Sequence, residues 1–199
     1  DIAGAVAAAL QPFSQPAVRT ASLSDAEQGL ADAALDATDV LFWWGHQRHD
    51  QVRDDRADAI VRRVLGTGMG FVALHSSHYS KPFKRLMNDA CDLGGVVGIN
   101  DAPEQIAVKA PDHPLARGVR DFRIPREEFY NEPFKVPEPD RVVFESTWST
   151  GQHFRSGCVW RRGNGRVFYF RPGHETFPTY FQPEVKAILV NAAGWIGPA

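Results

Sequence analysis

The chain has 199 residues, of which 43% are hydrophobic and 23% are charged, and its formal net charge is −2 at pH 7. These values are typical of a single soluble globular domain, here residues 1–199, and they give no electrostatic reason to expect nucleic acid or a membrane surface as a partner. No apolar run approaches the roughly 20 residues that a membrane span needs. Two cysteines are too few for a disulfide framework, so we expect a reduced, cytoplasmic compartment.

The chain opens on a segment with a helical pattern. Residues 2–10 are apolar and rich in alanine, and residues 18–21 predict a short strand. Helical turns are expected at residues 26–30, capped by Asp25, and at residues 31–37. Since a parallel α/β chain normally begins with a strand, the sequence predicts that a native amino-terminal strand precedes this segment.

Two apolar strands and two helices follow. Residues 40–44 form a continuous apolar run, as expected of a strand that is covered on both faces. Residues 51–65 carry apolar side chains at helical spacing and predict an amphipathic helix. A second buried strand is expected at residues 71–74, and a further helix begins at residues 82–87.

The second half is less regular. Residues 105–110 and 142–146 predict strands, and residues 157–162 and 166–170 flank a Gly-Asn-Gly turn that suits a hairpin. Residues 179–195 predict a final amphipathic helix. Strands that alternate with helices favour a parallel sheet covered on both sides, with the late hairpin as an antiparallel extension at one edge.

Each of the two apolar strands is followed by the spacing His-x-x-His, formed by His46 with His49 and by His75 with His78. Ligands in open α/β sheets bind at the carboxyl ends of the strands. Imidazole is a good ligand for zinc and other late transition metals. The four histidines therefore predict a divalent metal site, with zinc as a candidate. Structural histidines within the fold are the alternative.

His75 lies between a buried strand and a helix, where α/β enzymes place the sharp turn called the nucleophile elbow. An imidazole at this position can ligate a metal or transfer a proton. Ser76 and Ser77 could instead supply a nucleophile, or they could cap the helix that follows.

Two later segments carry further candidates. His174 follows a strand and the breakers Pro172 and Gly173, which places it at another strand end where it could act as a general acid or base. Glu128 lies in an acidic and aromatic stretch, and it could complete a metal site, donate a proton, or belong to a solvated loop. His75, His174 and Glu128 are thus the candidate catalytic residues.

Aromatic side chains are dense around these segments. Their faces suit sugar rings, although core packing is the commoner use of such residues. Trp44 and Tyr130, together with the carboxylate of Glu175, are the candidate substrate-binding residues.

Four segments, residues 43–50, 73–83, 127–130 and 160–176, together resemble the ThuA-like, or trehalose utilisation, family. The resemblance implies a flavodoxin-like three-layer sandwich with a mainly parallel sheet, related to the class I glutamine amidotransferase domain. In that wider group the elbow carries a cysteine nucleophile. His75 stands at this position here, so glutaminase chemistry is not expected.

The family resemblance also implies a role in the catabolism of trehalose-type disaccharides or keto-sugars. We therefore expect a metal-dependent hydrolase, lyase or isomerase with a small-molecule sugar as its substrate. A metal-free enzyme with His and Glu as acid and base is one alternative. A non-catalytic sugar-binding or regulatory module is another. A homo-oligomer is compatible with all three.

Overall fold

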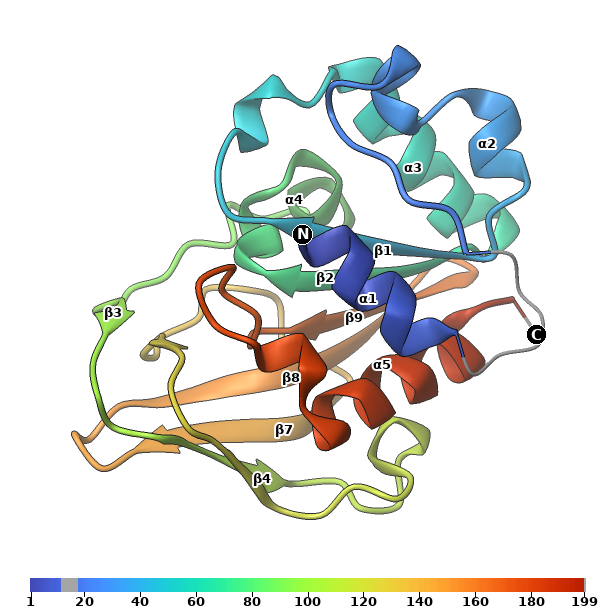
Figure 1. The fold of residues 1–199 in the computed structure, drawn as a ribbon. Helices are drawn as coiled ribbons and strands as arrows, with labels where there is room; N and C mark the ends of the chain where they lie inside the picture. The colour runs from blue at the N-terminus through green and yellow to red at the C-terminus, as the bar shows by residue number, and fades with distance from the viewer. Residues whose placement is uncertain (12–17, 199) are drawn as a thin grey trace.

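The computed structural model describes residues 1–11 and 18–198, and its centre is a seven-stranded mixed sheet flanked by helices (Figure 1). The strand order is β1-β2-β9-β8-β7-β4-β5. In chain order these strands are β1 (Val40–Gly45), β2 (Gly70–His75), β4 (Glu104–Val108), β5 (Phe122–Ile124), β7 (Arg141–Trp148), β8 (His153–Arg162) and β9 (Gly165–Phe170). A separate antiparallel pair joins β3 (Gly98–Ile99) to β6 (Glu128–Phe129).

The predicted α/β class is confirmed, but the expectation of a mainly parallel sheet is wrong. In the large sheet that the described residues form, the pairs β1/β2 and β2/β9 are parallel and the remaining pairs are antiparallel. Parallel neighbours need a long crossover, and α3 (Asp54–Thr67) provides one between β1 and β2. Short turns connect β7, β8 and β9, so these strands run antiparallel.

The predicted hairpin is confirmed as β8 and β9, which pair from Gly157 with Phe170 to Arg162 with Gly165. Its expected position at one edge of the sheet is wrong. β9 enters beside β2, and β7, β4 and β5 continue the sheet beyond β8. The hairpin therefore lies in the middle, where it joins the parallel part of the sheet to the antiparallel part.

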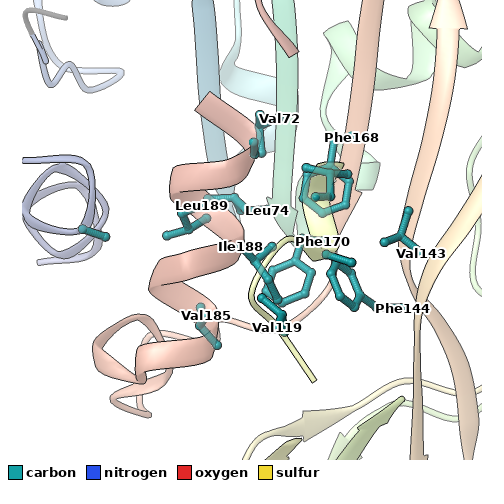
Figure 2. Close-up of a cluster of buried hydrophobic side chains, with 14 of the residues drawn as sticks. Val72, Leu74, Val119, Val143, Phe144, Phe168, Phe170, Val185, Ile188 and Leu189 are labelled. Atoms are coloured by element: carbon teal, nitrogen blue, oxygen red, sulfur yellow. The ribbon is translucent and has the colours of Figure 1, made fainter. Parts of the chain in front are cut away.

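Side chains of β2 and β9 alternate between the two faces of the sheet, as the pleat requires. Figure 2 shows Val72, Leu74, Phe168 and Phe170 packed with Ile188 and Leu189 of α5 (Pro183–Ile196). The intervening residues of both strands contribute to a second buried cluster, which includes side chains of α3 and α4 (Lys81–Met87). The helix α1 (Ile2–Leu10) packs with α5, and α2 (Asp32–Asp36) packs with α3 (Figure 1).

The amino-terminal third departs most from the sequence predictions. Residues 18–21 lie in no strand, so that prediction is wrong; a strand needs a pairing partner, and none of the described residues pairs with them. The turn expected at residues 26–30 is a 3-10 turn, Ala26–Gly29, and the Asp25 carboxylate accepts from the Ser22 N–H instead of capping it.

The first strand of the sheet, β1, is also less covered than its apolar sequence suggests. It lies at the end of the strand order, and all of its residues are half-buried. A groove of about 1690 Å³, lined in part by α1 and residues 18–23, runs along β1 and reaches His46 and Glu175. Within the described part of the chain, no helix is long and apolar enough to cross a membrane.

Candidate metal centre

Three adjacent parallel strands, β1, β2 and β9, bring three histidines to one edge of the sheet. His46 follows β1, His75 ends β2, and His174 follows β9. Glu128 reaches the same point from β6. One ring nitrogen or carboxylate oxygen from each of these four residues lies within 4.8 Å of those from the other three. His46, His75, Glu128 and His174 together are called the His/Glu cluster below.

His75 occupies the sharp turn that the sequence predicts. Its backbone has φ of +57° and ψ of −126°, a strained combination for a residue with a side chain. Ser77 Oγ lies 2.7 Å from the Trp43 carbonyl and 2.5 Å from the Leu74 carbonyl, so its hydroxyl holds the turn to two strands. The turn fixes the imidazole of His75 at the edge of the sheet.

The two serines of this turn have internal partners. Ser76 Oγ lies 2.5 Å from the hydroxyl of Tyr130, and Ser77 contacts backbone carbonyls. The residue that caps α4 is Ser80, whose hydroxyl accepts from the Phe83 N–H. These contacts favour a supporting role for Ser76 and Ser77 over a nucleophilic one.

Two buried atoms of the His/Glu cluster have no polar partner. His75 Nε2 and Glu128 Oε2 lie 3.5 Å apart, and neither has a hydrogen-bond partner among the described residues. A buried polar atom without a partner is costly, whereas a cation between an imidazole nitrogen and a carboxylate oxygen would satisfy both. The donor set of histidine and glutamate therefore fits a zinc ion or a similar divalent metal.

His46 has the hydrogen bond that metal-binding histidines usually make. Its Nδ1 lies 2.9 Å from both carboxylate oxygens of Glu175, which leaves Nε2 for the cluster. The side chains of His46 and Glu175 are 24% and 42% exposed, whereas His75 is fully buried. The cluster is therefore open to solvent on the His46 side.

The electrostatics of the site favour the ligand form of His75. Burial lowers the pKa of this imidazole well below its usual value, and the charge of Arg171 lowers it further. The ring is therefore neutral at pH 7, as metal binding requires. Burial raises the pKa of Glu128, although His174, His46 and Arg171 oppose the shift. A bound cation would further favour the carboxylate.

Glu127 supports the site, and the sequence does not identify it as a candidate. It is fully buried, and its carboxylate accepts from the backbone N–H groups of Glu128 (2.8 Å), Gly173 (2.9 Å) and His174 (3.2 Å) and from the Thr179 hydroxyl (2.6 Å). It thereby fixes the segments that carry Glu128 and His174 relative to each other.

A buried ion pair supports the same region. Arg171 and Glu104 are both fully buried and contact each other, and the Ser146 hydroxyl donates to Glu104. Arg171 also donates to the backbone carbonyl of Glu128, and its own carbonyl lies 3.4 Å from His75 Nδ1. The one sequence signal for Arg171 is a charged residue directly after the apolar strand β9.

The second histidine of each His-x-x-His pair lies outside the His/Glu cluster. His49 begins a 3-10 turn and lies beside Gly45 and the Tyr79 ring. His78 is fully buried among aromatic rings that include Tyr79, Phe134 and Tyr169. The chain turns after the first histidine of each pair, so the structure unites His46 with His75 and adds Glu128 and His174.

The candidate substrate-binding residues lie around the His/Glu cluster. The Trp44 indole stacks on the His75 ring and donates its N–H to the Gly173 carbonyl at 2.9 Å. Tyr130 is buried behind His75, with its hydroxyl on Ser76. Glu175 holds His46. All three therefore support the cluster, and direct contact with a substrate stays a prediction.

The fold and the site define an α/β protein with a His/Glu cluster at the carboxyl edge of its parallel strands. The family model of ThuA, described as trehalose utilisation, matches residues 3–196, and the chain belongs to this family. The sequence-based resemblance is thus confirmed. No protein among those with curated functions gives a significant match.

Solved structures share the fold. A ThuA-like protein from Bacteroides uniformis ATCC 8492 is 18% identical, with a TM-score of 0.63 over 86% of this chain and 74% of its own. A ThuA-like protein from Parabacteroides merdae ATCC 43184 is 13% identical, with a TM-score of 0.65 over 98% and 82%. A Salmonella typhimurium LT2 protein described as cytoplasmic is 10% identical, with a TM-score of 0.66 over 99% and 88%.

Proposed function

We propose that this protein is a metal-dependent enzyme of sugar catabolism that acts on a trehalose-type disaccharide or a keto-sugar. The observation that carries the proposal is the pair of buried, unpartnered ligand atoms, His75 Nε2 and Glu128 Oε2, 3.5 Å apart among the described residues. Membership of the trehalose utilisation family supports the substrate class. Hydrolysis, elimination and isomerisation are the reactions compatible with this site.

Each residue of the site would have a separate role. His46, His75 and Glu128 would hold the metal, with zinc as the candidate, and Glu175 would orient the His46 ring. When bound, the metal would supply Lewis acidity toward a carbonyl or hydroxyl oxygen. His174 lies at the same point. Tyr130, which is buried behind His75, would keep water from the inner side of the site. The substrate would approach from the open side, beside His46 and Glu175.

The first experiment measures the metal content of protein purified without chelators. We expect a stoichiometric divalent metal in the wild type and its loss in His75→Ala. His153→Ala is the matched control, because His153 is exposed and lies outside the His/Glu cluster. Incubation with trehalose and with 3-keto-trehalose, followed by NMR, identifies the product. The proposal would be refuted if the wild-type protein contained no metal and the His75→Ala variant kept the wild-type activity.

The same pair of atoms supports one alternative. At 3.5 Å, His75 and Glu128 are close to the distance at which an acid and a base exchange a proton. A metal-free enzyme that used this pair would keep its activity after dialysis against a chelator, whereas the metal-dependent enzyme would lose it. Zinc added back to the dialysed protein should restore the activity only in the metal-dependent case.

A further inference from the structure

Acceptors at Nδ1 favour the same tautomer for two histidines in the cluster. His75 Nδ1 faces the Arg171 carbonyl at 3.4 Å, and His46 Nδ1 faces the Glu175 carboxylate at 2.9 Å. Both partners are acceptors, so each Nδ1 carries the proton. The lone pair of each ring is then on Nε2, which is the atom free to bind a metal.

His174 has the opposite arrangement. The backbone N–H of Thr176 donates to His174 Nδ1 at 3.1 Å, so this nitrogen accepts and its lone pair is occupied. The nearest oxygen of Glu175 is 3.7 Å from the same nitrogen, which is beyond hydrogen-bond distance. The ring proton is then on Nε2.

The surroundings keep His174 in this state. The Glu127 carboxylate accepts hydrogen bonds from the backbone N–H groups of Gly173 and His174, and the Trp44 indole donates one to the Gly173 carbonyl. A rotation of the ring by 180° would place a carbon against the Thr176 N–H and lose that hydrogen bond. Ligation through Nε2 in the present orientation would require removal of its proton and would leave an anionic ring.

We infer that His174 is not a metal ligand but a hydrogen-bond donor, which presents its Nε2–H to an oxygen of the bound sugar. His46, His75 and Glu128 are then the ligand set. The His174 ring lies edge-on to His46 and His75, with ring centroids 4.8 and 5.4 Å away, so an oxygen atom at the metal would lie within its reach. A carbonyl or hydroxyl oxygen of a keto-sugar is an acceptor of the required kind. This inference rests on the proposed function.

NMR of the metal-free protein tests the tautomers directly. Long-range ¹H–¹⁵N correlations distinguish a protonated Nδ1 from a protonated Nε2, and the signal that disappears in His174→Gln identifies His174. We expect Nε2–H for His174 and Nδ1–H for His46 and His75. An Nδ1–H tautomer of His174 would overturn the inference.

Zinc affinity, measured by competition with a chromophoric chelator, tests the ligand set. We expect His174→Gln and His174→Ala to remain within about threefold of the wild type, and His75→Ala to bind at least about 100-fold more weakly, since loss of a supporting group alone costs 10- to 100-fold. Circular dichroism checks that each variant folds. Equal losses in the His174 and His75 variants would overturn the inference.

Turnover by zinc-saturated protein tests the donor role. For a sugar that the wild type converts, kcat of His174→Ala should fall by about 100-fold, the usual effect of removing one donor to a developing charge. An unchanged kcat would overturn the donor role. Wild-type protein that binds neither zinc nor another divalent metal would instead refute the proposed function, while the tautomers would still be decided by NMR.

Discussion

Glu127 connects the two segments that complete the His/Glu cluster, because its carboxylate accepts from both Glu128 and His174. We expect Glu127→Gln to lower the free energy of unfolding by about 2 kcal/mol, since the new amide can place an N–H against a buried N–H. Zinc affinity should also fall, by about 10-fold. Urea unfolding and chelator competition measure the two effects. Glu138→Gln is the control, because Glu138 is exposed, and equal stability of the two variants would contradict the prediction.

We expect the buried ring of His78 to make the fold sensitive to acid. Burial lowers the pKa of His78 to about 3 from the usual 6.5, so the unfolded chain binds a proton that the folded chain does not. Stability from this residue is therefore complete above pH 6.5 and is lost progressively as the pH falls toward 3. We expect His78→Phe to reduce the fall in unfolding free energy between pH 6.5 and 4. Urea titrations between these pH values measure the effect, with His153→Gln as the control. If the unfolding free energies of His78→Phe and the wild type fell in parallel with pH, the prediction would be contradicted.

At the residue scale, the sequence identified some members of the site and missed others. His46, His75 and His174 were recognisable because each follows an apolar strand. The roles of Glu127 and Arg171 could not be recognised from the sequence, because an isolated charged residue is more often solvated than buried. Their burial depends on partners far away in the chain, such as Glu104 for Arg171.

At the scale of elements, the segment after β9 is tied to β4 by the buried pair of Arg171 and Glu104. Loss of one partner leaves an uncompensated buried charge, so we expect Glu104→Gln to cost about 3–5 kcal/mol. The double variant Glu104→Leu with Arg171→Met should be less destabilised than the sum of its single substitutions. Urea unfolding of the three variants completes a double-mutant cycle, and strict additivity would contradict direct coupling.

The strands and helices show which local patterns were informative. Apolar runs and helical periodicity predicted β1, β2, α3 and α5, and the Gly-Asn-Gly turn predicted the hairpin of β8 and β9. The two-residue strands β3 and β6 were missed because they are too short to show alternation. The position of the hairpin depends on which strand β9 joins, and that choice is made by packing between distant segments.

At the scale of the whole molecule, the centre of the sheet should open last. β2, β9 and β8 have neighbours on both sides and buried side chains, whereas β5 is short and lies at the end of the strand order. We expect hydrogen exchange to be slowest in β2, β9 and β8 and fastest in β5 and in β3 with β6. Mass spectrometry of exchanged peptides measures this order. Protection of β5 equal to that of β9 would contradict it.

The three proposed ligands come from segments that are far apart in the chain, at positions 46, 75 and 128. Only the folded protein brings them together, so an ion bound there would add its binding free energy to the stability of the native state. The supply of metal would then determine how long each molecule survives proteolysis as well as whether it is active. Under the proposed function, a shortage of the metal would then lower the amount of this protein along with its activity.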